Sequence, residues 1–421
     1  MKKSYSILQK IKYLLKNILF FPTSPHITRL IFNFIFKKKN RHKYQKKINL
    51  ANINSVLIVQ LNQVGDVVIT APFLRELRCN LPNAWITIVV LPTTLNIVEK
   101  CPYINEVVSS NWTGDRDLNR YQRHWYSFKL AQIKLWKYHF DLAILPRIDT
   151  DQTHGTFVAF FSGARLRIGY SDKLFGKNIP YFRNTDCLLT HVIKAQNVKH
   201  EVEYHLELIH YMGGRIKSHK TEVWLDPEDE LYADQFIREY KVENNDILIA
   251  FSLGAGHPKR IWPTYRFSVI GSWLEKKYNA RILVLGCHGE HGIAQILQEH
   301  LNGDLINAVG QTTLRQAAAM LKHCNLYVGN DSGLMHIAAA TGITVVEISC
   351  HPQDGSPLNP SSPMRFGPWG VSHQILQPKQ AVLPCTNSCI AQEAHCICDV
   401  TVDQVKEAID GILSNQCQSK I

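Results

Sequence analysis

The stretch of residues 324–342 constrains the fold of this chain more than any other. Residues 326–328 form a short apolar run, which is typical of the end of a buried strand. Residues 329–333 then predict a tight turn, and residues 334–341 a short helix for which Gly342 is a suitable C-terminal cap. A second apolar strand is predicted directly afterwards. This order of strand, turn, helix and strand indicates a parallel α/β sheet.

The start of the predicted helix offers a position for an anion. The N–H groups of a helix start and the positive end of the helix dipole favour a phosphate or pyrophosphate. Asp331 and Ser332 are also ordinary N-cap residues. The turn alone therefore leaves an anion site and a plain helix start both open.

The rest of the chain repeats the alternation of strands and helices. Strands are predicted over residues 55–61, 85–91, 138–146, 247–252 and 281–285. Helices are predicted from about 66–71 to 77–79, with Pro72 in the first turn, and over 265–278, 290–300, 311–322 and 402–413. We expect an α/β chain with two Rossmann-like, doubly wound parallel-sheet domains that face each other across a cleft. The predicted division is an arm over residues 1–50, domains over 51–225 and 226–400, and a terminal helix and tail over 401–421.

Charge is concentrated at the N-terminus. The chain has 421 residues and a net charge of +12, but residues 1–65 alone hold thirteen Lys and Arg and no acid, so the body is close to neutral. A body that binds nucleic acid would be expected to have its own basic face, so we expect no nucleic-acid partner. Apolar residues recur at helical spacing over 7–19, between lysines, which predicts a basic amphipathic helix.

This arm has two interpretations. It could attach the chain to an anionic membrane surface, or it could pack on the body. Its longest uncharged run, residues 17–28, is shorter than the roughly 20 residues that span a bilayer. We favour peripheral attachment of residues 1–50 to the cytoplasmic face of the inner membrane.

The cysteines cluster near the C-terminus. No convincing secretory signal is present, which favours a reducing cytosol. Cys385, Cys389, Cys396 and Cys398 lie near His395 and could bind zinc, but their spacing differs from the usual paired Cys-x2-Cys. We therefore expect a structural or incidental cluster, no metal and no cofactor. The Asp-x-Asp triples at 115–117 and 149–151 are similarly interpreted as solvated loop carboxylates rather than metal ligands.

Several residues are expected on the cleft side of the second domain. Lys259 and Arg260, in the glycine-containing loop 253–263, suit the negative charge of a diphosphate. Glu290 follows a strand and a glycine turn and could accept hydrogen bonds from ribose hydroxyls. Together with the helix start at 331–336 they describe a pocket for a nucleoside diphosphate.

Four segments, in order, resemble the motifs of one enzyme family. Residues 64–72, 160–170, 259–263 and 328–336 are similar to motifs of the ADP-heptose:lipopolysaccharide heptosyltransferases, glycosyltransferase family 9. The similarity runs from about residue 54 to 414 and leaves out the arm. It implies a GT-B fold, which agrees with the two predicted domains.

The resemblance also implies roles for individual residues. Asp66 matches the proposed general base, and Arg260 matches a lysine that contacts phosphate, so Lys259 could share that role. Glu290 matches a ribose-binding acid, while His336 could contact phosphate or pack under the helix. The expected donor-binding residues are Gly256, Lys259, Arg260, Glu290, Asp331, Ser332, Gly333, Leu334 and His336.

We therefore expect an inverting, metal-independent glycosyltransferase that transfers a sugar, heptose from ADP-heptose, to a lipopolysaccharide core or a related lipid-linked acceptor. One alternative is a sugar-nucleotide epimerase of the same architecture, and another is a glycosyltransferase that uses a different nucleotide sugar. A non-catalytic lipid or nucleic-acid binder is a third. A nicotinamide-binding enzyme is disfavoured, because residues 62–66 lack the Gly-x-Gly-x-x-Gly pattern. Donor base, acceptor linkage and oligomeric state stay open.

Overall fold

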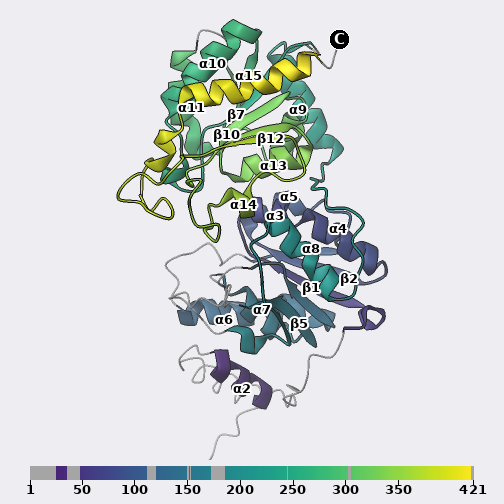
Figure 1. Ribbon diagram of the computed structural model, residues 1–421. Helices are drawn as coiled ribbons and strands as arrows, with labels where there is room; N and C mark the ends of the chain where they lie inside the picture. The colour runs from purple at the N-terminus through teal and green to yellow at the C-terminus, as the bar shows by residue number, and fades with distance from the viewer. Residues whose placement is uncertain are drawn as a thin grey trace, which may run out of the picture.

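The computed structural model describes residues 25–35, 48–110, 120–148, 151, 153–171, 185–243, 245–301 and 305–418. These form two lobes, one above the other in Figure 1, with the N-terminal lobe in purple to teal and the C-terminal lobe in green to yellow.

The N-terminal lobe is built on a six-stranded parallel sheet. Its strands are β1 Ser55–Gln60, β2 Trp85–Val90, β3 Glu106–Ser109, β4 Leu142–Leu145, β5 Leu166–Tyr170 and β6 His191–Ile193, in the order β3-β2-β1-β4-β5-β6. The order reverses between β1 and β4, and ligands of such sheets bind at the carboxyl ends of the strands at this switch point.

The C-terminal lobe repeats the same winding. Its strands are β7 Leu248–Ser252, β8 Arg281–Leu285, β9 Ile306–Asn307, β10 Leu326–Asn330, β11 Thr344–Ile348 and β12 His373–Leu376, in the order β12-β11-β10-β7-β8-β9, all parallel. Counted within its own lobe, each sheet has the order 3-2-1-4-5-6. The prediction of two doubly wound parallel sheets is confirmed.

Helices cover both sheets. Those of the N-terminal lobe are α3 Val64–Val68, α4 Ala71–Asn80, α5 Leu95–Val98, α6 Arg120–Leu130, α7 Gly155–Phe161 and α8 Glu201–Tyr211. Those that follow are α9 Pro227–Glu239, α10 Thr264–Tyr278, α11 His291–His300, α12 Leu314–Leu321, α13 Gly333–Thr341, α14 Pro363–Phe366 and α15 Val402–Gln418.

The helix predicted to start between residues 66 and 71 and to end between 77 and 79 is present as α4, and the short helix α3 precedes it as a separate element. Thr70 lies between them and its hydroxyl donates to the Asp66 carbonyl at 2.7 Å. Pro72 then lies in the first turn of α4, where its missing N–H has no cost. The chain can therefore turn at residues 69–70, and α3 is an additional short helix that the sequence did not predict.

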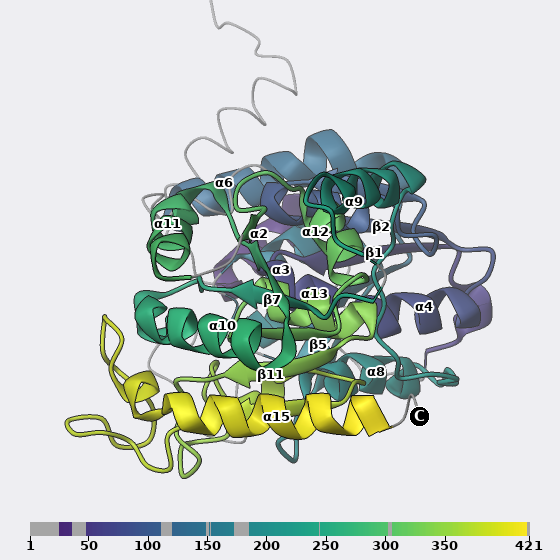
Figure 2. The same cartoon turned by 90° about the horizontal axis from the view of Figure 1, so that it is seen from above.

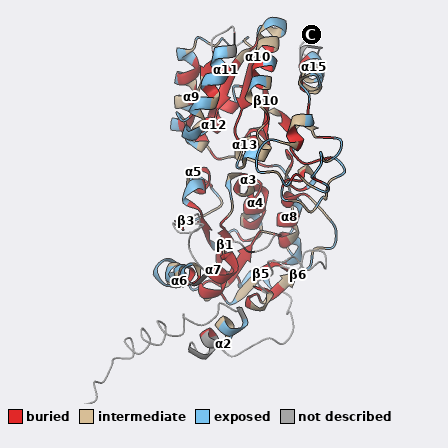
Figure 3. Cartoon of the chain, turned by 90° about the vertical axis from the view of Figure 1, so that its left-hand side faces the viewer, coloured by how far each residue is buried: buried red, intermediate tan, exposed pale blue. Residues whose placement is uncertain are grey.

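Successive side chains of a strand point to opposite faces of its sheet, so each sheet has an apolar cluster on either face. In β7, Leu248 and Ala250 pack with α9, α12 and α13, whereas Ile249 and Phe251 pack with α10, α11 and α15. The first of these clusters also contains Val56 of β1, so one apolar core runs through the junction of the two lobes. The buried strands are red in Figure 3 and the exposed helix faces pale blue.

One helix of the N-terminal arm is described, α2 Pro25–Ile35. It lies against the N-terminal lobe, since the Phe32 ring is 4.9 Å from that of Phe160 and Arg29 donates to the Cys187 carbonyl at 3.3 Å. The basic amphipathic helix predicted over 7–19 lies outside the described residues. Within the described residues, every helix is too short or too polar to cross a bilayer.

Candidate active site at the junction of the two lobes

The two lobes meet where α3 faces the start of α13, as Figures 1 and 2 show. A Cβ atom added to Gly65 would lie 2.4 Å from Cδ2 of His336, and one added to Gly333 would lie 3.0 Å from Cβ of Val64. Real Cβ contacts are longer than the first distance, so the backbone of α3 packs directly on α13 because residue 65 has no side chain.

Asp66 follows Gly65 in α3, so its carboxylate belongs to the helix that forms this contact. Asp66 is half-buried, and its Oδ2 accepts the N–H of Gln63 at 3.2 Å. That bond satisfies one N–H of the first turn, as an N-terminal acid commonly does. The structure thus brings Asp66 and the turn at Gly333, which lie far apart in the sequence, to the same junction.

The start of α13 has the predicted form. Ser332 is the N-cap, and its hydroxyl accepts the N–H of Met335 at 3.4 Å. Gly333 and Leu334 occupy the first turn, where N–H groups have no partner within the helix. Gly342 caps the other end with a φ of 93°, a backbone conformation that favours glycine.

Arg260 forms an ion pair with Asp331 just before this helix. Its Nη1 lies 3.1 Å from Oδ2 of Asp331, and a quarter of the Arg260 side chain is exposed. Glu347 of β11 is buried beside them, and burial together with the charge of Asp331 raises its pKa well above the usual range. Burial and the neighbouring Asp331 thus both disfavour the charged form of Glu347, whereas Arg260 opposes this effect.

The loop before Arg260 is fixed by hydrogen bonds from two directions. Asn330, at the end of β10, accepts the N–H of Trp262 at 3.0 Å and donates to the Leu253 carbonyl at 2.7 Å. Lys259 extends away from Arg260 and donates to the Cys389 carbonyl at 2.9 Å. Gly256 is exposed at the turn of the loop, and no described atom lies within 4 Å of an added Cβ.

Glu290 lies between two glycine turns that follow β7 and β8. A Cβ on Gly254 would lie 1.7 Å from its Oε1, and one on Gly286 would lie 2.2 Å from its Oε2. Its Oε2 accepts the N–H of Cys287 at 3.2 Å, and burial raises the pKa of the carboxyl. The two glycines thus leave room for a carboxylate at the carboxyl edge of the sheet, where ligands bind.

His336 is buried in α13 and packs on Gly65. Burial lowers its pKa to about 3, so the ring is neutral at pH 7 and brings no positive charge to the junction. Its Nδ1 has no hydrogen-bond partner among the described residues. Of the two roles left open by the sequence, the geometry favours packing.

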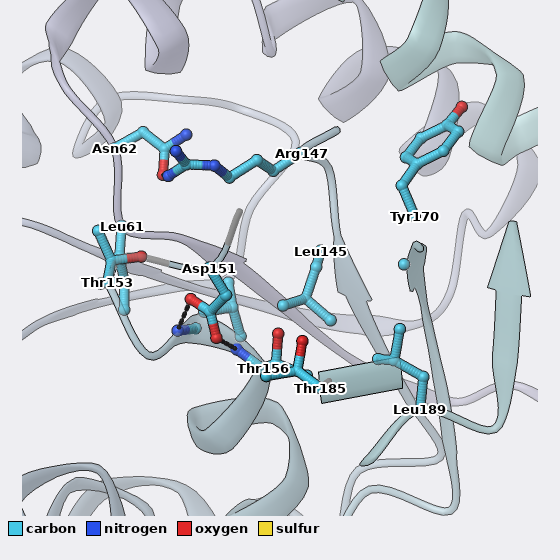
Figure 4. A pocket seen from close by; sticks show the side chains of 13 residues that line it. Leu61, Asn62, Leu145, Arg147, Asp151, Thr153, Thr156, Tyr170, Thr185 and Leu189 are labelled. Carbon is cyan, nitrogen blue, oxygen red and sulfur yellow. Dashed lines mark hydrogen bonds between the residues drawn. The ribbon is translucent and has the colours of Figure 1, made fainter. Parts of the chain in front are cut away.

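A small pocket lies in the N-terminal lobe at its switch point, lined by residues that include Asn62, Arg147 and Asp151 (Figure 4). Arg147, just after β4, donates to Asn62, just after β1, at 2.7 Å. Asp151 accepts the N–H groups of Gly155 at 2.8 Å and Thr156 at 3.0 Å, so it caps the start of α7.

Arg147 and Asn62 were not predicted as site residues from the sequence. The available signal was their position, since each polar side chain follows a buried strand that pairs with the other. Asp151 was considered only as half of an Asp-x-Asp triple, and its partner Asp149 lies outside the described residues, as do Asp115 and Asp117.

The model of glycosyltransferase family 9 (heptosyltransferase) matches residues 128–395. The chain belongs to this family. Family 9 membership makes the chain a glycosyltransferase, as its motifs predicted.

Sequence relatives are consistent with family 9. The chain is 25% identical over 353 residues to lipooligosaccharide heptosyltransferase 2 of Haemophilus ducreyi, covering 78% of this chain and 87% of the relative. It is 21% identical to lipopolysaccharide heptosyltransferase 2 of Salmonella typhimurium, covering 86% of this chain and 99% of that protein.

Solved structures confirm the fold. A family 9 glycosyltransferase from Veillonella parvula matches with a TM-score of 0.70 and 21% identity, covering 86% of this chain and 98% of that one. The ADP-heptose lps heptosyltransferase II of E. coli matches with a TM-score of 0.62 and 19% identity, covering 86% and 99%. The GT-B fold expected from the motifs is therefore correct.

Proposed function

We propose that this family 9 enzyme is an inverting, metal-independent heptosyltransferase that transfers heptose from ADP-heptose to a lipopolysaccharide core or related lipid-linked acceptor. One observation carries the proposal: α3, which holds Asp66, packs on the start of α13, which offers N–H groups for a phosphate. A base and a leaving-group site at one junction are what transfer of a sugar requires. The names of the relatives supply the sugar and the acceptor class.

In the proposed reaction, a hydroxyl oxygen of the acceptor attacks the anomeric carbon of the donor. The new C–O bond forms as the bond from that carbon to the diphosphate oxygen breaks, so the configuration inverts and ADP leaves with the electron pair. Asp66 takes the hydroxyl proton. A carboxylate positioned for this step contributes about 10²–10⁴-fold to the rate.

The leaving diphosphate gains negative charge, which the C-terminal lobe is suited to stabilise. We assign this role to the N–H groups of Gly333 and Leu334, capped by Ser332, and to the exposed part of Arg260. Asp331 orients Arg260 through their ion pair. Glu290 would accept from ribose hydroxyls, while Lys259 and Gly256 shape the loop and His336 packs between α13 and Gly65 of α3.

The acceptor would approach from the N-terminal lobe. The pocket beside Arg147 is open, lies at the switch point and presents a guanidinium that suits an anionic sugar. We further propose that residues 1–50 bind an anionic membrane surface on the cytoplasmic side. Their excess of Lys and Arg supports this, and the packing of α2 on the N-terminal lobe would place that lobe next to the membrane.

The test is transfer from ADP-heptose to a lipid acceptor isolated from a heptose-deficient strain, with the product measured by mass spectrometry. We expect the acceptor to gain one heptose, and Asp66→Asn to lower kcat by at least about 10²-fold because the amide cannot accept the proton. Asp403→Asn, at an exposed position in α15, is the matched control and should retain full activity.

Two results would contradict the proposal. Transfer at near wild-type rate by Asp66→Asn would remove the base assignment. A product that is an isomerised nucleotide sugar, with no enlarged acceptor, would point to the epimerase alternative.

A further inference from the structure

A long segment between β12 and the short 3-10 helix Cys396–Asp399 has no regular structure, yet holds buried thiols. Residues 377–395 are all described and contain neither helix nor strand. The side chains of Cys385, Cys389 and Cys396 are nevertheless only 2%, 4% and 0% exposed. Long loops of this kind inside a compact lobe are uncommon and need something to hold them in place.

The three thiols converge on one imidazole. One ligand atom from each of Cys385, Cys389, His395 and Cys396 lies within 4.8 Å of every other. Nδ1 of His395 is 3.6 Å from Sγ of Cys385 and 3.4 Å from Sγ of Cys396. All of these cysteines are free thiols in the structure.

These distances fit a tetrahedral metal centre. With metal–sulfur bonds of about 2.3 Å and metal–nitrogen bonds of about 2.0–2.1 Å, a tetrahedron separates sulfur from nitrogen by about 3.6 Å. The two separations given above lie close to that value. In addition, the N–H of Ile390 points at Sγ of Cys385 at 3.4 Å, as outer hydrogen bonds commonly do at metal-bound thiolates.

We propose that Cys385, Cys389, His395 and Cys396 bind a single thiophilic metal ion, Zn²⁺ or iron. Four protein ligands complete a tetrahedron and leave no open position, which is the pattern of a structural site. The proposal reverses the expectation of an incidental cluster. Cys-x3-Cys followed by an adjacent His-Cys pair is not the familiar spacing, so the sequence alone did not distinguish Cys398, whose sulfur lies outside the set, from the three ligands.

The metal would join the irregular segment to the loop of Arg260. The Cys389 carbonyl accepts from Lys259, the residue before Arg260. Past the cluster, the Val400 carbonyl accepts from Trp262 at 2.9 Å and from Arg266 at 2.7 Å. The centre therefore holds the outer side of that loop in place and takes no part in sugar transfer.

The first experiment measures metal in the full-length chain, purified without added metal or chelator, by inductively coupled plasma mass spectrometry. We expect about one equivalent of zinc or iron per chain. Cys389→Ser and Cys385→Ser should lose most of it. Cys398→Ser is the matched control, because it removes a half-buried thiol of the same segment that is not a ligand, and it should retain the metal.

A second measurement uses the wild-type chain only, so a variant that fails to fold does not affect it. Titration with a mercurial should release the metal as the thiolates react, and chelation should lower the midpoint of thermal unfolding. Iron would give a visible thiolate-to-metal absorption band, whereas zinc would leave the protein colourless. The absorption spectrum therefore distinguishes the two metals.

Three results would overturn the proposal: absence of stoichiometric zinc and iron, full metal retention in both serine variants, or a disulfide within the cluster. None of these readouts depends on activity, so they stand apart from the test of the proposed function.

Discussion

Asp331 and Glu347 place two carboxyl groups in one buried region that contains a single guanidinium, that of Arg260. Burial raises the pKa of both carboxyls, while Arg260 opposes this rise. An oxygen of Asp331 contacts the guanidinium, whereas Oε2 of Glu347 has no hydrogen-bond partner among the described residues. We therefore expect the charge of Arg260 to stabilise the fold and, under the proposed function, to contribute to donor binding.

Replacement of Arg260 separates these two effects. Arg260→Ala leaves Asp331 buried without its cation, so we expect a loss of about 3–5 kcal/mol in unfolding free energy and a raised KM for the donor. Arg260→Lys keeps the charge, and we expect it to recover most of the donor affinity but less of the stability, because it lacks the planar fork. Urea unfolding and steady-state kinetics measure the two effects.

The control for this pair is Arg238→Ala, which removes a largely exposed arginine of α9 and should change stability by less than about 1 kcal/mol. Equal losses of unfolding free energy in Arg260→Ala and Arg238→Ala would show that the buried ion pair stabilises the chain no more than an exposed one.

At the scale of elements, the decisive contact is that of α3 on α13. It depends on the absence of a side chain at position 65, since an added Cβ would overlap the His336 ring, and that ring is buried and has little room to move. Overpacking of this kind usually destabilises a protein by about 1–3 kcal/mol.

We therefore expect Gly65→Ala to destabilise the chain by about 1–3 kcal/mol and to lower transfer activity, because it displaces α3 from α13. His336→Ala in the same chain should restore part of the loss, which a double-mutant cycle of unfolding free energies would detect. The matched control is Gly292→Ala in α11, where no described atom lies within 4 Å of the new methyl and the substitution should be neutral or slightly stabilising. Simple additivity of Gly65→Ala and His336→Ala would contradict this account.

Local signals made many elements predictable. The strand at Arg281–Leu285, the helix that ends at Tyr278 and the capping box that starts α15 each depend on residues close together in the sequence. The contacts within the candidate site were harder to predict from the sequence. Glu347 reaches Asp331 only because β10 and β11 pair in register, and Lys259 turns to a carbonyl of the distant segment at Cys389, so neither could be found from spacing.

At the scale of the whole molecule, the two lobes are joined by more than the linker between α8 and α9. One apolar core passes through the junction. Glu201 of α8 accepts from Arg365 of α14 at 2.8 Å, and both are buried. Arg315 of α12 donates to the Asn96 carbonyl of α5 at 2.7 Å. The junction therefore shares the stability of the lobes and is not a loose hinge.

Buried histidines in both lobes predict an acid-sensitive fold. Burial lowers the pKa to about 4 for His124, His200 and His205 and to about 3 for His336. Below about pH 6.5 each of these histidines binds a proton in the unfolded chain but not in the folded chain. Their contribution to the unfolding free energy is therefore complete above pH 6.5 and is lost as the pH falls towards 4.

We expect the unfolding free energy to fall by about 1 kcal/mol per buried histidine between pH 7.5 and 5.5. Urea unfolding at the two values measures it. His205→Gln should reduce the difference, whereas replacement of the exposed His219 by Gln should not. A stability that is flat over this range would show that the histidines are solvated.

The two lobes have sheets of the same strand order and belong to one polypeptide, which affects how the enzyme responds to dilution. Two separate polypeptides of this shape would meet only by diffusion, and their encounter would weaken as the solution thinned. Residues 212–226 tether them instead, so that each half experiences the other at an effective concentration on the order of millimolar. Dilution should accordingly leave the two lobes together, in a crowded cell and in a nanomolar assay alike.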